Sequence, residues 1–181
     1  MNLDAILEQV LVRERGYVNN PADKGGATKY GVTAATLGAW RKLGRKATPA
    51  EVATLTPFEA KAIFADQYVR APGFLVFGDR PAFLAVLVDL AINSGPKRAI
   101  ILLQRTLGVV DDGVLGPKTI AAARAQPDVR LALRLSTQRL RFLGRLISGD
   151  LTDKDKDGIP DNAEFAAGWI NRTCDQIDGL T

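Results

Sequence analysis

The sequence predicts a mainly α-helical (α+β) protein: a helical bundle around a central apolar helix, with a small loop or β-hairpin after the first helix. Three observations support this class. Apolar residues recur at helical spacing, as at Leu3, Leu7 and Val10. Two Thr-Pro pairs, each followed by Glu, have the pattern of helix starts. Residues 83–92 are apolar on nearly all sides, which is typical of a buried central helix.

The elements are expected in the following order. The first helix covers residues 3 to about 14 and ends before Gly16, and segment 17–33 forms the loop or hairpin. Thr48 and Thr56 are predicted to cap two helices, the second of which buries Ile63 and Phe64 and ends near Tyr68. Further helices are expected at about 81–92, 97–107, 117–124, 129–147 and 162–177, with a polar loop at 148–160.

Composition excludes several kinds of chemistry. The chain has 181 residues, enough for one domain or two small packed ones, and no apolar run reaches the ~18 residues of a membrane span. It has no histidine and one cysteine, Cys174, which we expect to be buried. An internal disulfide, a Ser-His-Asp triad and a Cys-His dyad are therefore excluded. No secretory signal is visible at the N-terminus.

Charge is unevenly distributed along the chain. Residues 97–145 contain ten Lys or Arg against three acids, whereas residues 150–164 contain six acids against two lysines. The basic stretch favours an anionic partner, which could be nucleic acid, a membrane or an acidic polymer. A solvated helical face explains it equally well, and no nucleic-acid-binding motif accompanies it.

Glu14 is the first candidate for acid-base chemistry. It lies on the apolar stripe of the first helix and at its C-terminus, and both positions raise the pKa of a carboxyl group. Asp23 and Thr28 follow in a glycine-rich segment. A protonated acid facing a second carboxylate is the arrangement that glycoside hydrolysis requires, and a hydroxyl can hold the attacking water. A solvated Glu and an ordinary turn Asp are the alternative interpretation.

The segment from Glu14 to Thr33, ERGYVNNPADKGGATKYGVT, resembles the signature of the glycoside hydrolase family 108 N-acetylmuramidases, which are phage endolysins and related muramidases. That signature begins Glu-Gly-Gly-Tyr, so Arg15 departs from it. The Glu–Asp–Thr triad of phage-type lysozymes has one more residue between Asp and Thr than Asp23 and Thr28 have. Segments 89–95, 111–119 and 168–172 resemble the family's C-terminal peptidoglycan-binding region, so the resemblance covers nearly the whole chain.

The resemblance implies a lysozyme-like fold with a catalytic region at 1–92 and a peptidoglycan-binding region at 93–181. It implies cleavage of the β-1,4 bond between N-acetylmuramic acid and N-acetylglucosamine, with Glu14 as general acid beside Asp23 and Thr28. Substrate contacts are expected from Tyr17, Gly26, Tyr30 and Asn93. The expected partner is peptidoglycan, without nucleic acid or stable membrane insertion. A monomer is expected in the host cytoplasm, released to the periplasm or cell wall with the possible help of a holin.

Residues 153–164, DKDKDGIPDNAE, match the twelve-residue EF-hand calcium loop. The expected ligands are Asp153, Asp155, Asp157, the carbonyl of Ile159, Asp161 and Glu164, and a structural Ca²⁺ is the one cofactor predicted. Pro160 departs from paired EF-hands, so a single loop is expected. An acidic loop without an ion is the alternative.

Two other functions remain open at this point. A lytic transglycosylase needs one acid and leaves an anhydro-muramic end. A calcium-dependent wall-binding module without catalysis does not need Glu14 at all.

Overall fold

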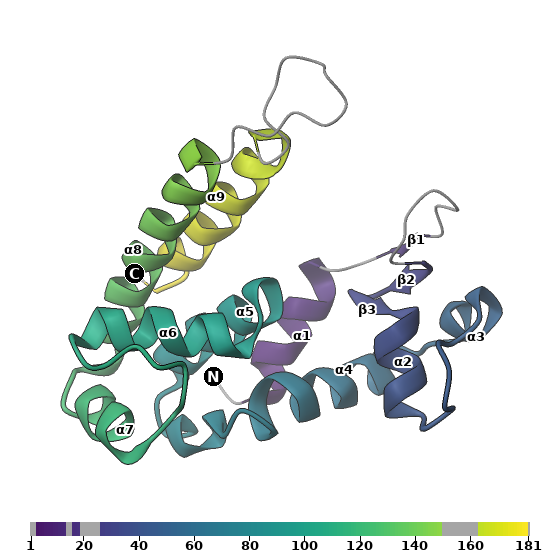
Figure 1. Ribbon diagram of the computed structural model, residues 1–181, viewed down its shortest axis with the longest axis horizontal. Helices are drawn as coiled ribbons and strands as arrows, with labels where there is room; N and C mark the ends of the chain where they lie inside the picture. The colour runs from purple at the N-terminus through teal and green to yellow at the C-terminus, as the bar shows by residue number, and fades with distance from the viewer. Residues whose placement is uncertain (1–2, 14–15, 19–25, 150–162, 181) are drawn as a thin grey trace. The chain divides into compact units, whose positions relative to one another are not determined.

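The computed structural model describes residues 3–13, 16–18, 26–149 and 163–180, and the chain divides into two compact units, Met1–Leu75 and Val76–Thr181. Helices dominate both units, and a small antiparallel sheet lies in the first (Figure 1). The predicted mainly α class with a hairpin after the first helix is confirmed.

The first unit begins with α1 (Leu3–Arg13). A sheet follows in the order β1 (Tyr17–Val18), β2 (Thr28–Lys29) and β3 (Val32–Thr33). The unit continues with α2 (Ala34–Trp40), α3 (Pro49–Ala53) and α4 (Pro57–Ala65), and a π-helical turn, Asp66–Arg70, extends α4. A 3₁₀ turn, Phe74–Phe77, lies at the junction with the second unit.

Threonine caps fix the helix starts of the first unit. Thr48 accepts the N–H of Glu51, while the Glu51 carboxylate accepts the N–H of Thr48 at 2.6 Å, which completes a capping box. Thr56 caps α4 by accepting the N–H of Glu59. Both predicted caps are confirmed. Helix α2 was not expected, although Thr33 caps it by accepting the N–H of Thr36.

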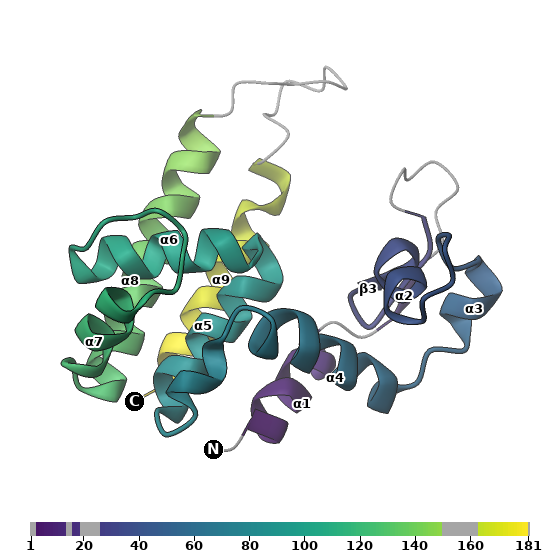
Figure 2. The same ribbon diagram turned by 60° about the horizontal axis from the view of Figure 1, so that its bottom comes forward.

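Helix α1 packs against α4, and the two lie side by side in Figures 1 and 2. The predicted apolar stripe faces inward, since four of its residues are buried: Ile6, Leu7, Val10 and Leu11. At the edge of this contact, the Lys61 ammonium donates to Asp4 at 3.0 Å and to Glu8 at 2.6 Å. These contacts fix how α1 packs within the first unit.

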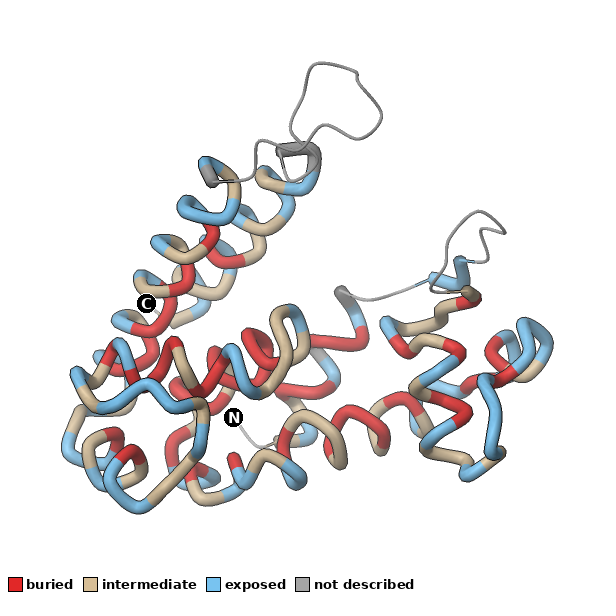
Figure 3. Tube along the Cα trace, viewed as in Figure 1, coloured by how far each residue is buried: buried red, intermediate tan, exposed pale blue. Residues whose placement is uncertain are grey.

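The second unit is all helical within the described residues. It contains α5 (Pro81–Ser94), α6 (Pro96–Leu107), α7 (Pro117–Arg124), α8 (Asp128–Gly149) and α9 (Ala163–Asp178). Helix α8 packs against α5, α6 and α9. Figure 3 shows buried positions recurring along α5, α6 and α8. The apolar helix α5 is thus the centre of this unit, as its sequence predicted.

A buried ion cluster joins three helices of the second unit. Asp89 of α5 accepts from Arg139 of α8 and from Arg172 of α9, each at 2.8 Å. Asp89 is 1% exposed and Arg139 2%. Burial opposes ionisation of Asp89 most strongly, but the two guanidinium groups together keep the pKa of its carboxyl below the ordinary value. Sequence patterns gave no sign of this cluster.

A second buried polar side chain, Gln104 of α6, organises the loop before α7. Its amide nitrogen donates to Asp112 Oδ1 at 2.7 Å and to the carbonyl of Val114 at 2.9 Å. Its amide oxygen accepts the N–H of Gly113 at 2.9 Å. The predicted turn at 111–113 is therefore stabilised by hydrogen bonds to the buried amide of Gln104.

One packing prediction was wrong. Cys174 is exposed, because on α9 it follows Thr173, which occupies the buried position of that turn. Within the described residues, no helix combines the length and the apolar character needed to cross a bilayer.

Candidate active site

The predicted catalytic residues are only partly visible. Glu14 and Asp23 lie outside the described residues, as do Arg15 and the chain from 19 to 25. Thr28 is the first residue of β2 and is half-buried. The described part of the site is therefore the sheet, together with the end of α1 that leads to it.

Strand register divides the sheet into two rows of side chains. Tyr17 pairs with Lys29, which pairs with Val32, and we name these three residues the Lys29 row. Val18 pairs with Thr28, which pairs with Thr33, and these form the Thr28 row. Directly opposed residues project from the same face of an antiparallel sheet, while successive residues alternate. The two rows therefore lie on opposite faces.

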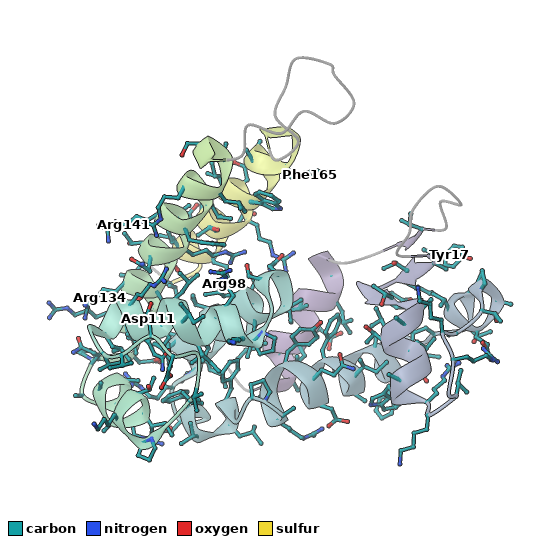
Figure 4. All side chains as sticks on the ribbon, in the orientation of Figure 1. Tyr17, Arg98, Asp111, Arg134, Arg141 and Phe165 are labelled. Atoms are coloured by element: carbon teal, nitrogen blue, oxygen red, sulfur yellow. The ribbon has the colours of Figure 1, made fainter. Side chains whose placement is uncertain are left out.

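The Lys29 row is tied to α3. The Tyr17 hydroxyl donates to the carbonyl of Pro49 at 3.4 Å, and the Lys29 ammonium donates to that of Ala53 at 2.5 Å. Val32, the third member, is 1% exposed. Figure 4 labels Tyr17 beside this small sheet. This face of the sheet packs against the rest of its own unit.

The Thr28 row is more open. Val18 is 61% exposed, and Thr28 and Thr33 are half-buried. Thr33 uses its hydroxyl to cap α2. By contrast, the hydroxyl of Thr28 makes no hydrogen bond to another described residue. A hydroxyl can both donate and accept a hydrogen bond.

The β2–β3 turn connects this sheet to the chain near Glu14. Tyr30 and Gly31 form the turn with φ of 52° and 74°, and a two-residue turn with both φ positive matches the twist of the strands. The N–H of Tyr30 donates to the carbonyl of Gly16 at 3.3 Å. Gly16 is two residues after Glu14 in the sequence. The turn and the candidate acid's segment are thus joined by a backbone hydrogen bond.

The four predicted substrate contacts have different positions. Tyr17 lies on the face opposite Thr28, and the Tyr30 ring lies 5.4 Å from the Lys29 ammonium, whose side chain belongs to the Lys29 row. Gly26 has a φ of 75°, which few other residues adopt. Asn93 lies in the second unit, where its amide donates to the carbonyl and the carboxylate of Asp89 at 2.8 and 3.2 Å.

The predicted calcium loop lies almost wholly outside the described residues. Asp153, Asp155, Asp157, Ile159 and Asp161 are not described, and of Glu164 only the place in the first turn of α9 is given. Among the described residues, no three acidic, cysteine or histidine side chains gather as a metal site would require.

Residues 7–95 match the model of the family Glycosyl hydrolase 108, and residues 98–174 match the family described as Predicted Peptidoglycan domain. The first match includes α5, which packs within the second unit. No curated protein sequence matches the chain.

The solved structure of Brucella abortus SagA is similar over nearly the whole chain. The two share 34% sequence identity with a TM-score of 0.78, and the alignment covers 98% of this chain and 92% of that one. The chain therefore belongs to the glycosyl hydrolase 108 family, and it is a glycoside hydrolase that acts on peptidoglycan.

Proposed function

We propose that this chain is an N-acetylmuramidase that cleaves the β-1,4 bond between N-acetylmuramic acid and N-acetylglucosamine. Glu14 protonates the glycosidic oxygen as the bond to the sugar carbon breaks. Asp23 either activates a water molecule or stabilises the positive charge that develops on the sugar. The Thr28 hydroxyl holds that water.

The observation that carries this proposal is the hydroxyl of Thr28, which has no hydrogen-bond partner among the described residues. It lies on the open row of a hairpin whose turn hydrogen-bonds to Gly16, two residues after Glu14 in the sequence. The hydroxyl of Thr33, the neighbouring threonine of the same row, caps α2 by accepting the N–H of Thr36. Among the threonines of the sheet, Thr28 is thus the one with a donor and an acceptor left for the reaction.

Product analysis tests the proposal. Purified Gram-negative peptidoglycan is digested with the wild type and with Glu14→Gln, and the product ends are identified by mass spectrometry. We expect reducing muramic ends from the wild type and a loss of about 10²–10⁴-fold in rate for Glu14→Gln, the usual contribution of a general acid. Glu8→Gln is the control, because Glu8 is an exposed carboxylate of α1, the helix that precedes Glu14 in the sequence.

The other outcomes identify other functions. Anhydro-muramic ends would assign a lytic transglycosylase. A protein that binds peptidoglycan but releases no product, with Glu14→Gln binding equally well, would be a binding module. Retention of full activity in Glu14→Gln would remove Glu14 from the mechanism.

We also propose that residues 153–164 bind a structural Ca²⁺. The support is the ligand pattern of the sequence, in which oxygen-bearing residues occupy positions 1, 3, 5, 9 and 12 and glycine occupies position 6. The loop connects α8 to α9, so an ion there would stabilise the pairing of these two helices.

A further inference from the structure

Val18 has an unusual position for an apolar residue. It is 61% exposed, whereas the valine of β3, Val32, is 1% exposed. It belongs to β1, an edge strand of the sheet. Its directly opposed neighbour is Thr28, whose hydroxyl has no described partner. Side chains opposed in this way have Cβ atoms about 4.5–5.5 Å apart.

The two rows of the sheet differ in what holds them. Both polar members of the Lys29 row reach α3, through Tyr17 to Pro49 and through Lys29 to Ala53. In the Thr28 row, the side chain with a described hydrogen bond is that of Thr33, which caps α2. Val18 and Thr28 therefore present an isopropyl group and a hydroxyl without a described partner together on the same face of the sheet.

We propose that Val18 and Thr28 form a subsite for one N-acetylated sugar of the glycan strand, and that Val18 makes the enzyme selective for the acetamido group. An acetamido substituent carries an apolar methyl next to a polar amide. Val18 packs against the methyl, which removes apolar surface from water. The Thr28 hydroxyl exchanges hydrogen bonds with the polar groups of the same sugar, directly or through the reacting water. This inference rests on the proposed function.

The occupant follows from the chemistry of the pair. A membrane surface or an apolar protein face would require a continuous apolar patch. Here the apolar surface is one side chain, and a hydroxyl stands directly opposite it. A small ligand with a methyl beside hydrogen-bonding groups fits this combination, and the glycan strand of peptidoglycan repeats such a group on every sugar.

The test measures how strongly the enzyme prefers glycan strands that carry the acetamido group. Soluble glycan strands are compared with the same strands after chemical de-N-acetylation, and kcat/KM is measured on both. We expect Val18→Ala to lower kcat/KM on acetylated strands about fivefold, the effect of losing roughly one methyl contact, with little change on deacetylated strands. Val18→Thr, which exchanges one methyl for a hydroxyl at nearly constant shape, is expected to reduce the preference in the same direction.

Two control variants separate this role from a general effect on folding. Val12→Ala alters another valine of the first unit, 50% exposed on α1, and should leave the preference unchanged. Phe58→Ala removes another exposed apolar side chain of the first unit, 83% exposed on α4, and should also leave the preference unchanged. An unchanged ratio of the two kcat/KM values in Val18→Ala overturns the proposal, whatever the effect on absolute activity.

Binding distinguishes failure of this inference from failure of the proposed function. If the wild type releases no product, co-sedimentation with acetylated and deacetylated sacculi replaces the kinetic measurement. Weaker binding of Val18→Ala than of Val12→Ala to acetylated sacculi alone supports the subsite even then. Equal binding of the two variants overturns it.

Discussion

Among the described residues, the most deeply buried ion pairs of the two units differ in their exposure. In the second unit, a nearly inaccessible carboxylate, Asp89, joins α5, α8 and α9 through Arg139 and Arg172. In the first unit the ion pairs lie nearer the surface, as in the Arg41–Glu59 pair, whose side chains are 26% and 19% exposed. An exposed ion pair contributes little to the stability of the fold, because water solvates both charges. A buried charge that loses its partner destabilises the fold strongly. Among the described residues, the unit with the candidate catalytic residues thus contains fewer buried charges.

The largest expected effect tests this contrast at Asp89. Asp89→Asn removes the buried negative charge that two guanidinium groups share, and we expect a loss of about 3–5 kcal/mol in the free energy of unfolding. Glu59→Gln, which breaks the Arg41 pair of the first unit, should cost about 1 kcal/mol or less. Denaturant unfolding of both variants gives the two values. Equal losses of unfolding free energy in the two variants would show that the burial of an ion pair does not determine how much it contributes to stability here.

The calcium proposal concerns the second unit alone. If residues 153–164 bind Ca²⁺, the ion stabilises the folded chain by about 2.7 kcal/mol at a concentration one hundred times its Kd. The rise in Tm between chelator and saturating Ca²⁺ measures this. Asp157→Asn should reduce the rise, whereas Asp150→Asn, an acid just outside the twelve-residue loop, should not. An equal Tm in chelator and in saturating Ca²⁺ would contradict the proposal.

A close backbone contact in the first unit predicts the next effect. A Cβ at Gly38 of α2 would lie 2.2 Å from the carbonyl oxygen of Arg45 and 2.9 Å from the nitrogen of Ala47. Because backbone atoms cannot easily move away, Gly38→Ala should cost about 1–3 kcal/mol. Gly144 of α8 has no such neighbour within 4 Å, so Gly144→Ala should stabilise by about 0.5–1 kcal/mol. Thermal unfolding of the pair compares them, and opposite signs are expected.

Local signals in the sequence predicted most helices. The caps at Thr48 and Thr56 and the apolar run of α5 are each written in a few neighbouring residues, and all three are confirmed. Helix α2 was missed because Thr33 caps it without the following proline and glutamate that marked the other two. Periodicity at the N-terminus likewise identified the buried stripe that leads to Glu14.

The buried ion cluster and the candidate site were less predictable, because both depend on long-range pairing. Asp89 lies 50 residues from Arg139 and 83 from Arg172, and no local pattern connects them. The two faces of the sheet depend on register, which is set by a Tyr-Gly turn instead of the usual Asn-Gly. Tyr17 and Thr28 were therefore grouped in one site by sequence, although register puts them on opposite faces.

The smallest expected effect is the loss of stability at low pH when Glu51 becomes protonated. Arg45 and the Thr48 cap lower the pKa of Glu51 from 4.5 to about 2, so the ionised carboxylate favours the folded state. Its folded pKa lies below its unfolded value. This contribution is therefore complete above about pH 4.5 and is lost as the pH falls towards 2. Glu51→Gln should make unfolding less dependent on pH in this range, as measured by denaturant unfolding at successive pH values.

Salt separates this contribution from that of Asp89, whose pKa is also lowered and whose stabilisation is also lost in acid. The Arg45–Glu51 pair is exposed, so 1 M salt should screen it and remove most of the difference between Glu51→Gln and the wild type. Asp89 is shielded from ions by burial, so its share of the acid sensitivity should persist in salt. If high salt abolished the whole acid sensitivity, the buried cluster would not be its source, and the contrast between the two units would lose its electrostatic basis.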